Sequence, residues 1–540
     1  MADRAILQAL EDAKSLSDDI LKYRLTLIIC HMTYYQIKPD IIFRNYGDFG
    51  YITDNRNFGY HFSNTSYVLG DRIVSESGAV ILSCLEKEPL PLDEIVRRAM
   101  KEFIGVNENQ LRSDTESLLQ ALTEAGFIIT GESADECRGK SCFTTKHETA
   151  NKVFENNAFK NKPITTQAFF EKLFGETPFP VSVHIEIVSK CNERCIHCYI
   201  PHEYKNQVMD ATMFFGLLDQ CLELKIQHIT ISGGEPMLHP QFIPFLRKCR
   251  EYDMSVNVLS NLTLLDDDIV DEMKRNPLLG VQTSIYSIRP EIHDAITNSK
   301  GSLQKTKNGL IKLVENRIPV QISCPIMKTN LDSYKEIKNW AAQFNVSVGY
   351  DYTLIGQYNG RTANLHCRLS EEEVERVIVN ELTTNPNYKQ ELLDEATENR
   401  NKSQEDYICS VCNSSICVAQ NGNVFPCAGW QGYVLGNIAD SSLADIWYHS
   451  KKVDYLRSLK RKDFKECQGC QQRDYCTVCM VRNFNESPTG NPLEISKYFC
   501  KVAEIKKRLA EETLCNSSIY GCLSNDWECC DFVCRYNNRN

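Results

Sequence analysis

Two patterns of hydrophobic and polar positions alternate along the middle of the chain. Short apolar runs rich in β-branched residues are typical of buried strands, and they include VSVHIEIV, HITISGG, SVNVLSN, GVQTSIYS, VQISCPIM and SVGYDYTLI. Between them, segments such as ATMFFGLLDQCLEL repeat their apolar residues every three or four positions, which predicts amphipathic helices. The alternation predicts an α/β fold over residues 176–360, with a parallel sheet that is open or partly closed. About six strands are too few for a complete eight-stranded barrel.

The segment before this region predicts a small separate domain. Over residues 35–130, short strands with Gly and Asn turns, FGYITDNRNFGYHF and TSYVLG, precede a helix from Ser75 to Glu86 with Ser75 as its cap. Two further helices, LPLDEIVRRAMKEF and DTESLLQALTEAGFII, complete the pattern of a winged helix. We interpret residues 1–34 as a helical segment and the polar residues 131–175 as a linker with some helix.

After residue 360 the periodic pattern weakens while cysteines accumulate. Residues 361–405 look helical and polar, which indicates a helical bridge. Residues 406–510 show little regular pattern but hold nine cysteines, which predicts a loop-dominated domain. Residues 511–540 form a cysteine-rich tail of unknown role, with Cys515, Cys522, Cys529, Cys530 and Cys534.

Composition and charge narrow the class of protein. With 540 residues, 42% of them apolar and 24% charged, the chain is long enough for several globular domains. Its formal net charge of −11 offers no surface for nucleic acid or an anionic membrane. No signal peptide is visible, and the early apolar stretch Leu25–Cys30 is too short to cross a bilayer. We therefore expect a cytoplasmic protein whose 25 cysteines act as metal ligands or reactive thiols rather than in disulfides.

Three cysteines lie close together directly after the first predicted strand of the α/β region. Cys191, Cys195 and Cys198 are separated by three and two residues on one tight loop. This spacing suits a [4Fe–4S] cluster that is held through three irons and leaves the fourth open for a substrate. The alternative is a set of buried thiols or a structural zinc site, for which His197 is the nearby fourth ligand.

This spacing resembles the CxxxCxxC signature of radical S-adenosylmethionine (SAM) enzymes, which follows the first strand of a partial (β/α)6 barrel. A second family motif ends the next strand, at Gly233-Gly234-Glu235-Pro236. In the family this turn receives the amino group of the methionine moiety. Glycines let a backbone approach a ligand closely, and a carboxylate pairs with an ammonium. The resemblance implies that the three cysteines bind the catalytic cluster and that a 5′-deoxyadenosyl radical takes a hydrogen from the substrate.

Other residues match this family less specifically. The resemblance implies further SAM contacts from His197, Ser232, Asn261 and Ser284. A strand-end cap or a buried polar group is an equally good explanation for the softer matches. The pair His293-Asp294 resembles a family dipeptide, but a helix start in a surface loop explains it better. Three cysteines in apolar stretches are expected to be inert core thiols, namely Cys221, Cys249 and Cys324.

The downstream cysteines match the SPASM extension of the family, which holds two auxiliary [4Fe–4S] clusters, although the last short gap is two residues instead of three. The resemblance implies a first auxiliary cluster held by Cys412, Cys427 and Cys479, with Cys409 as fourth ligand. It implies a second auxiliary cluster held by Cys467, Cys470, Cys476 and Cys500. Cys417 is the alternative fourth ligand of the first cluster, although it reads as a core residue of a strand, and without either thiol one iron stays open. A zinc ribbon is the alternative for the CxxC pairs.

The winged helix resembles a precursor-peptide recognition element over SESGAVILSCLEKEPLPLDEIVRRAM. Such elements bind a leader peptide as an added strand at a sheet edge. A nucleic-acid-binding winged helix is disfavoured, because acidic residues between 35 and 130 are at least as frequent as basic ones. The implied partners are therefore a precursor peptide and an external one-electron donor such as flavodoxin or ferredoxin, without nucleic acid or membrane.

Together these features predict a radical SAM maturase of a ribosomally made precursor peptide, with SAM and three [4Fe–4S] clusters as cofactors. A thioether cross-link of the sactipeptide or ranthipeptide kind is the first hypothesis for its product. One alternative is a maturase that oxidises a cysteine or serine of a protein, as sulfatase activators do without a front recognition element. Another is a non-enzymatic iron–sulfur electron carrier or peptide binder, which would not need the Gly-Gly-Glu-Pro motif.

Overall fold

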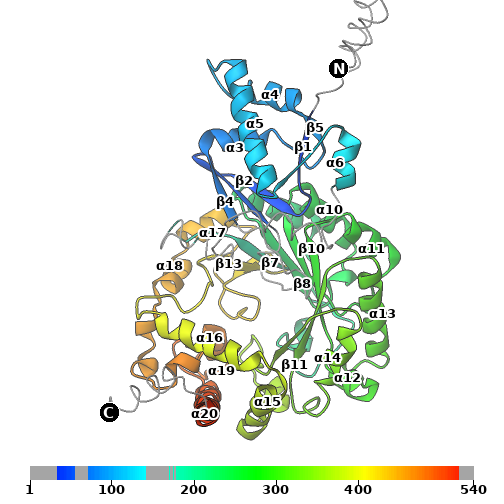
Figure 1. The fold of residues 1–540 in the computed structure, drawn as a ribbon. Helices are drawn as coiled ribbons and strands as arrows, with labels where there is room; N and C mark the ends of the chain where they lie inside the picture. The colour runs from blue at the N-terminus through cyan, green and yellow to red at the C-terminus, as the bar shows by residue number, and fades with distance from the viewer. Residues whose placement is uncertain (1–32, 55–70, 141–169, 171–173, 175–177, 522–540) are drawn as a thin grey trace, which may run out of the picture. The chain divides into compact units, whose positions relative to one another are not determined.

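The computed structural model describes residues 33–54, 71–140, 170, 174 and 178–521, with side chains up to residue 513 in the last helix. The chain divides into two compact units, Met1–Gly175 and Glu176–Asn540, and Figure 1 labels most of their elements. The predicted helical segment before residue 33, the strand TSYVLG, the linker beyond residue 140 apart from residues 170 and 174, and the tail cysteines after Cys515 lie outside the described residues.

The N-terminal unit contains two small antiparallel sheets, with strand orders β5-β1-β6 and β2-β3-β4. Its strands are β1 (Tyr34–Ile37), β2 (Ile41–Asn45), β3 (Phe49–Asp54), β4 (Asp71–Ser75), β5 (Leu90–Pro91) and β6 (Ile128–Gly131). Its helices are α3 (Glu76–Ser83), α4 (Leu92–Ala99), α5 (Glu108–Glu124) and α6 (Ala134–Lys140). Apolar side chains of both sheets and of α3, α4 and α5 share one core, which includes Ile52, Leu82, Ile95 and Leu119.

Caps explain where two of these helices begin. The side chain of Ser75 accepts a hydrogen bond from the backbone N–H of Gly78 at 3.2 Å, so the predicted cap of α3 is confirmed. The predicted start of the third helix at Asp114 is wrong. Asn107 caps α5 through the N–H groups of Asn109 and Gln110, and the helix begins six residues earlier than its apolar pattern indicated.

The C-terminal unit is built on six parallel strands in the order β12-β11-β10-β9-β8-β7. They are β7 (Ser182–Val188), β8 (His228–Gly233), β9 (Ser255–Leu259), β10 (Leu279–Ser284), β11 (Val320–Pro325) and β12 (Val348–Asp351). The connecting helices are α9 (Ala211–Glu223), α10 (Phe242–Glu251), α11 (Asp267–Lys274), α12 (Pro290–Thr297), α13 (Ser302–Glu315) and α14 (Glu336–Ala342). Helices α10, α11, α13 and α14 lie along the outer side of the sheet (Figure 1). The predicted alternation is therefore confirmed, whereas α12 was not predicted.

The cysteine-rich segment continues this sheet on the side of β7. Strand β13 (Ser415–Val418) pairs in parallel with β7, and β14 (Asn423–Phe425) and β15 (Gly436–Asn437) follow in antiparallel order. The remaining helices are α15 (Glu371–Thr384), α16 (Tyr388–Asn401), α17 (Leu443–His449), α18 (Lys451–Ser458), α19 (Met480–Glu486) and α20 (Lys497–Gly521). The segment 406–510 thus holds more regular structure than its sequence pattern indicated.

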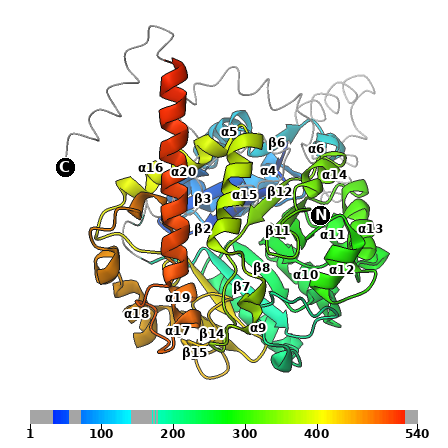
Figure 2. The same ribbon diagram turned by 90° about the horizontal axis from the view of Figure 1, so that it is seen from below.

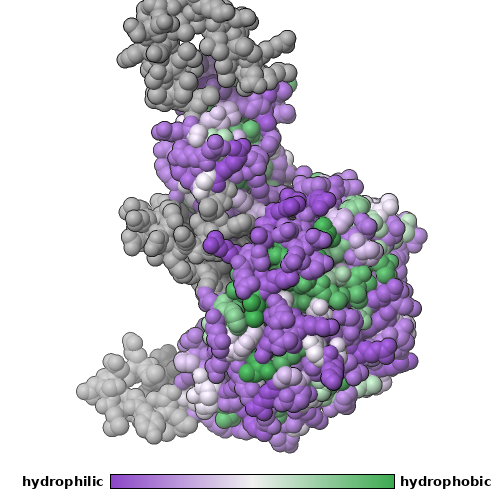
Figure 3. Space-filling model, turned by 90° about the vertical axis from the view of Figure 1, so that its right-hand side faces the viewer, coloured by the Kyte–Doolittle hydropathy of each residue, from purple (hydrophilic) through white to green (hydrophobic). Residues whose placement is uncertain are grey.

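Figure 2 shows α20 running beside α15 and α16, which it contacts. On the face shown in Figure 3, hydrophilic residues predominate and hydrophobic residues form separate patches. Within the described ranges, no helix has both the length and the apolar character that crossing a membrane requires.

Candidate functional site

Cys191, Cys195 and Cys198 occupy the loop that leaves the carboxyl end of β7, and all three are partly buried. Helix α12 holds this loop in place. The backbone N–H of Arg194 donates to the carbonyl of Thr297 at 2.9 Å, and that of Ile196 donates to the carbonyl of Ile296 at 3.0 Å. Burial raises the pKa of Cys191 to about 11, so a bound cation is needed to make this thiol a thiolate ligand at neutral pH.

A buried carboxyl group lies inside the cysteine loop. Glu193 accepts hydrogen bonds from the hydroxyl of Ser302 and, at 3.7 Å, from the thiol of Cys195. Its backbone N–H donates to the sulfur of Cys191 at 3.4 Å. Burial raises the pKa of Glu193. Sequence analysis missed this residue, although a carboxylate between cysteine ligands was the available signal.

His293 and Asp294 are not part of a surface loop, so that interpretation is wrong. His293 lies within α12 and is 1% exposed. Its Nδ1 accepts from the backbone N–H of Tyr286 at 3.3 Å, and its Nε2 lies 3.4 Å from the hydroxyl of Ser302. The carboxylate of Asp294 accepts from the N–H groups of Gly301 and Leu303 at the start of α13. The hydroxyl of Ser302, which His293 contacts, also donates to Glu193 in the cysteine loop. The pair therefore supports the cysteine loop through Ser302.

The ring of His197 packs edge-on against Tyr286, with 5.0 Å between the ring centroids. Burial lowers the pKa of His197 to about 4, so the ring is neutral at physiological pH. Its Nδ1 is buried and has no hydrogen-bond partner among the described residues. An acceptor-capable ring atom beside the three thiols fits a ligand donor, which is consistent with the predicted SAM contact.

The two glycines of the Gly-Gly-Glu-Pro turn allow a close approach to the end of β7. A Cβ atom on Gly233 would lie 1.9 Å from the carbonyl oxygen of Val188, and one on Gly234 would lie 2.1 Å from that of Lys190. Gly233 also has φ +134°, which favours glycine. The N–H of Gly234 donates to Val188 at 2.7 Å. These glycines therefore set the turn directly against the strand that leads into the cysteine loop.

The carboxylate of Glu235 is 0% exposed and is bonded within the chain, and its pairing with a ligand ammonium stays a prediction. It accepts hydrogen bonds from the hydroxyl of Ser260 at 2.8 Å and from the N–H groups of Asn261 at 2.8 Å and Met237 at 3.1 Å. Burial raises its pKa to about 7. The carboxyl group thus joins the turn after β8 to the end of β9.

The other predicted SAM contacts have partners within the chain. Ser232 is buried and its hydroxyl lies in hydrogen-bond contact with the ring of His184 on β7. The side-chain N–H of Asn261 donates to the Oδ1 of Asn192, inside the cysteine loop, at 2.9 Å. Ser284 is partly exposed at the carboxyl end of β10 and hydrogen-bonds to Tyr286. Asn261 therefore lies next to the cysteine loop, and Ser284 lies next to Tyr286, which packs against His197. The hydroxyl of Ser232 is instead bonded within the core.

The cysteines assigned to the first auxiliary cluster interact electrostatically with one another. Cys409 interacts with Cys479, and Cys427 interacts with both. Burial raises the pKa values of Cys412 and Cys427 to about 12. The carbonyl of Cys412 accepts from Arg457 Nε at 2.7 Å.

Several other cysteines belong to the core. Cys417 is 0% exposed in β13 and packs against Ala419 and Phe425, which agrees with a core role. The predicted core thiols are confirmed as fully buried, namely Cys221, Cys249 and Cys324.

The cysteines assigned to the second auxiliary cluster also lie together. Burial, followed by the charges of Cys476, Cys470 and Cys500, raises the pKa of Cys467 to about 11. Cys467, Cys470 and Cys476 line a cavity that Arg461 and Arg473 share. Within the described residues, no three such side chains converge on one point as ligands of a single metal ion do. Four neighbouring thiols flanked by two cations fit a negatively charged, thiolate-bound group.

Glu186 is a second buried carboxyl group that sequence analysis missed. It is 1% exposed on β7, a strand that is otherwise largely apolar. It accepts from the hydroxyl of Tyr199 at 3.2 Å and from the side-chain amides of Gln431 at 2.6 Å and Gln420 at 3.4 Å. Burial raises its pKa to about 7. Glu186 therefore connects the cysteine loop, through Tyr199, with the β13–β15 region.

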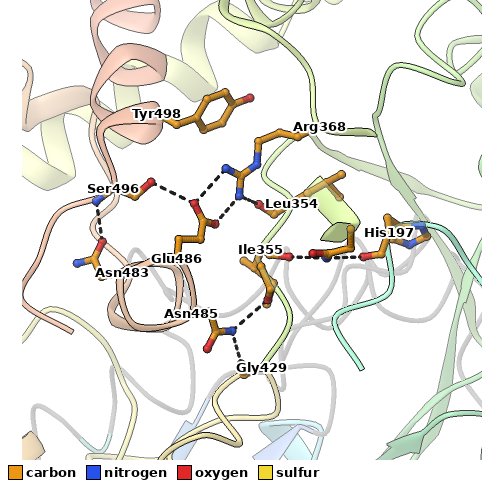
Figure 4. Close-up of polar contacts among 12 residues, drawn as sticks. His197, Leu354, Ile355, Arg368, Gly429, Asn483, Asn485, Glu486, Ser496 and Tyr498 are labelled. Carbon is orange, nitrogen blue, oxygen red and sulfur yellow. Dashed lines mark hydrogen bonds and ion pairs between the residues drawn. The ribbon is translucent and has the colours of Figure 1, made fainter. Parts of the chain in front are cut away.

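Two buried asparagines connect the cysteine loop with the cysteine-rich domain (Figure 4). The side-chain N–H of Asn364 donates to the carbonyl of His197 at 3.1 Å and to that of Ile355 at 2.9 Å. The side-chain N–H of Asn485 donates to the carbonyl of Gly429 at 2.8 Å and to the carbonyl of Gly356 at 3.1 Å. Gly429 follows Cys427 by two residues, so the segment around Ile355 lies between two predicted cluster sites.

Three family models match separate parts of the chain. The radical SAM superfamily model matches residues 185–341, the SPASM iron–sulfur cluster-binding domain matches residues 409–471, and the coenzyme PQQ synthesis protein D (PqqD) model matches residues 73–128. These matches confirm the resemblances found in the cysteine motifs and in the front domain. They also agree with the cofactors expected from the motifs, namely SAM, one catalytic [4Fe–4S] cluster and additional iron–sulfur clusters.

The chain is similar in sequence or in structure to proteins whose names give different activities. The AdoMet-dependent heme synthase of Methanosarcina barkeri is 23% identical over 60% of this chain and 98% of its own length. The antilisterial bacteriocin subtilosin biosynthesis protein AlbA of Bacillus subtilis is 23% identical over 58% of this chain and 70% of its own length. The crystal structure of Streptococcus suis SuiB bound to precursor peptide SuiA has a TM-score of 0.55 at 16% identity, covering 86% of this chain and 99% of that chain, which shows a shared fold. The chain therefore contains a radical SAM domain, a SPASM domain and a PqqD-like domain in one polypeptide.

Proposed function

We propose that this protein is an enzyme that modifies a ribosomally synthesised precursor peptide by radical SAM chemistry. The observation that carries the proposal is the presence of a PqqD-like match, a radical SAM match and a SPASM match in one chain. A peptide-binding domain is thereby tethered to a radical-generating domain, which raises the local concentration of its substrate. The names of AlbA, for bacteriocin biosynthesis, and of SuiB, bound to a precursor peptide, support this assignment.

In this proposal Cys191, Cys195 and Cys198 hold the catalytic cluster. That cluster with bound SAM supplies a 5′-deoxyadenosyl radical, which takes a hydrogen atom from the peptide. The chain's own contribution is to hold the site rigid. Helix α12 fixes the cysteine loop through two backbone hydrogen bonds, and Asn364 fixes the carbonyl of His197. His197, Gly233, Gly234, Asn261 and Ser284 offer the contacts for SAM, while Ser232 and Glu235 support the turn from within.

The cysteine-rich domain holds the two auxiliary clusters in this proposal. Cys409, Cys412, Cys427 and Cys479 bind the first, and Cys467, Cys470, Cys476 and Cys500 bind the second. The electrostatic contacts of Cys409 with Cys427 and Cys479 support a first auxiliary cluster with four thiolate ligands. A cluster closed in this way would serve as an electron relay and would pass on the surplus electron that remains when carbon and sulfur join.

The finer assignments are a thioether as the product, an external one-electron donor such as flavodoxin or ferredoxin, and a cytoplasmic location. A thioether is compatible with the auxiliary clusters, because forming a carbon–sulfur bond leaves one electron that such a cluster can accept. The donor is required because reductive cleavage of SAM consumes an electron.

The decisive experiment replaces Cys191, Cys195 and Cys198 together with Ala. After anaerobic reconstitution with iron and sulfide, we expect the variant to form no 5′-deoxyadenosine from SAM and dithionite, while retaining the iron of two clusters. Cys221→Ala is the matched control, because this thiol is buried in α9 and belongs to none of the three groups, and it should leave SAM cleavage intact. SAM cleavage by the triple variant would refute the assignment of the catalytic cluster.

The substrate class is tested with the peptide encoded by a short reading frame beside the gene. We expect the peptide to lose two hydrogens per cross-link and one alkylatable thiol per thioether formed. A peptide that keeps every thiol alkylatable after it loses hydrogen would overturn the thioether assignment but keep the radical modification. A mass change at a single Cys or Ser without a cross-link would favour the protein-oxidising alternative.

A further inference from the structure

The cavity beside the second group of cysteines contains two arginines that the proposed function does not use. Arg461 and Arg473 line this cavity together with Cys467, Cys470 and Cys476. They come from two different 3-10 helices, Arg461–Asp463 and Arg473–Tyr475, that lie on either side of the first two cysteines in the sequence. The fold therefore brings two cations to one small, thiol-lined space.

Each guanidinium group keeps one buried donor without a partner. The Nε–H groups of Arg461 and Arg473 have no hydrogen-bond acceptor among the described residues. One Nη of Arg473 donates to the carbonyl of Lys402, so the side chain is anchored on its far side. A buried donor without an acceptor costs on the order of 1–3 kcal/mol, more for a charged group. Such unpartnered donors at a cavity wall point to an acceptor that occupies the cavity.

The charges around Arg461 identify the kind of acceptor. Its guanidinium interacts with the thiols of Cys476 and Cys467 and with the carboxylate of Asp406, and it is repelled by Arg473. Two like charges placed side by side in a partly buried site require a negative group between or beside them. A cluster bound by four thiolates is such a group, and its sulfur atoms accept hydrogen bonds.

We propose that Arg461 and Arg473 donate hydrogen bonds to sulfur atoms of the second auxiliary cluster and raise its reduction potential. This inference rests on the proposed function, which places a cluster at Cys467, Cys470, Cys476 and Cys500. Reduction adds a negative charge to the cluster, and nearby cations and N–H donors stabilise the more negative state. The second auxiliary cluster is thereby the preferred acceptor for the electron that the radical reaction leaves behind.

The test is a redox titration of the reconstituted holoenzyme, followed by electron paramagnetic resonance, with wild type, Arg461→Gln, Arg461→Lys and Arg473→Gln. In each Gln variant, we expect the midpoint reduction potential of one cluster to fall by about 59 mV. For a one-electron couple this corresponds to about a tenfold change in the reduction equilibrium. Arg461→Lys keeps the charge but loses the Nε–H, so its midpoint should lie between those of Arg461→Gln and wild type. Arg508→Gln is the charge control on α20 and should leave all midpoints unchanged.

The outcomes separate this inference from the proposed function. A wild-type protein that binds iron for only two clusters contradicts the second auxiliary site itself. Three wild-type clusters with unchanged midpoints in both Gln variants overturn only the role of the arginines. If Arg461→Gln loses about four irons, Arg461→Lys decides: a retained cluster with a lowered midpoint supports the proposal. A retained cluster with an unchanged midpoint, or loss of the cluster from this variant as well, overturns it.

Discussion

At the level of single residues, three buried carboxyl groups connect the elements around the cysteine loop. Glu186, Glu193 and Glu235 all lie near the carboxyl ends of β7 and β8, and each accepts hydrogen bonds from neighbouring elements. Burial raises the pKa values of Glu186 and Glu235 to about 7. A carboxyl group that titrates near neutral pH makes the stability of the protein depend on pH.

Glu186→Gln tests this dependence. The folded-state pKa of about 7 lies above the ordinary value of 4.5, so between these values the folded protein holds a proton that the unfolded chain has lost. Stability from this group is therefore fully present below pH 4.5 and is lost as the pH rises through 7, by at most about 1.4 kcal/mol per pH unit. Urea melts from pH 5 to 7.5 should show wild type losing stability relative to the variant as pH rises. Parallel curves for the two proteins would contradict the buried, protonated Glu186.

Cys409→Ala tests the fourth ligand of the first auxiliary cluster. Because Cys409 interacts with Cys427 and Cys479, we expect its removal to abolish the electron paramagnetic resonance signal of that cluster and to release up to four irons. Cys417→Ala is the matched control, since this thiol is core-buried in β13 and should leave the iron content unchanged. A cluster that survives Cys409→Ala and responds only to an added cysteine-containing peptide would instead make the fourth iron a substrate site.

At the scale of elements, the turn after β8 depends on its lack of side chains. Gly234→Ala places a Cβ atom 2.1 Å from the carbonyl oxygen of Lys190, and the two backbones have to separate. We expect a loss of about 3 kcal/mol or more in the free energy of unfolding, together with weaker SAM binding. Urea unfolding and equilibrium dialysis with SAM measure the two effects.

Gly216→Ala is the control for that substitution. A Cβ atom on Gly216 meets nothing within 4 Å inside α9, and Ala is the better helix former by up to about 1 kcal/mol. This variant should be as stable as wild type or more so, with SAM binding unchanged. Equal losses in both glycine variants would show that the close approach to β7 is not the cause.

At the level of the whole C-terminal unit, a largely buried ion pair joins the segment between β12 and α15 to α19 of the cysteine-rich domain (Figure 4). Arg368 and Glu486 are each 10% exposed, and the guanidinium also donates to the carbonyl of Leu354 at 2.5 Å. Arg368 lies 4.7 Å from the centre of the Tyr498 ring. One charge left alone in this place is costly, whereas removing both costs much less.

Arg368→Met should therefore lower the free energy of unfolding by about 3–5 kcal/mol, because Glu486 stays buried without its partner. The double variant Arg368→Met/Glu486→Leu should recover most of this loss. Arg376→Met removes a guanidinium from an exposed pair with Asp332 and should cause no measurable change. A double variant that is less stable than Arg368→Met would contradict the unpaired Glu486 carboxylate as the cause of the loss.

Features that depend on the local order of residues could be predicted from the sequence alone. Strand and helix periods are set by neighbouring residues, so the alternation from β7 to β12 was visible in the pattern of apolar positions. Cluster cysteines come in short fixed spacings, so Cys191, Cys195 and Cys198 and the later series were recognisable before any fold was known. Ser75 as a helix cap belongs to the same class, because a cap acts within three residues.

Only the tertiary structure decided which distant segments meet. The pairing of β13 with β7, the placement of His293 behind the cysteine loop and the inward orientation of Glu235 all join residues far apart in sequence. The same holds for Arg461 and Arg473, which are ordinary basic residues in the sequence and become cavity-lining cations in the fold. A local pattern gives the spacing of apolar positions along an element, but it does not identify the partner of a side chain. Burial and charge pairing depend on packing between elements that are distant in the sequence.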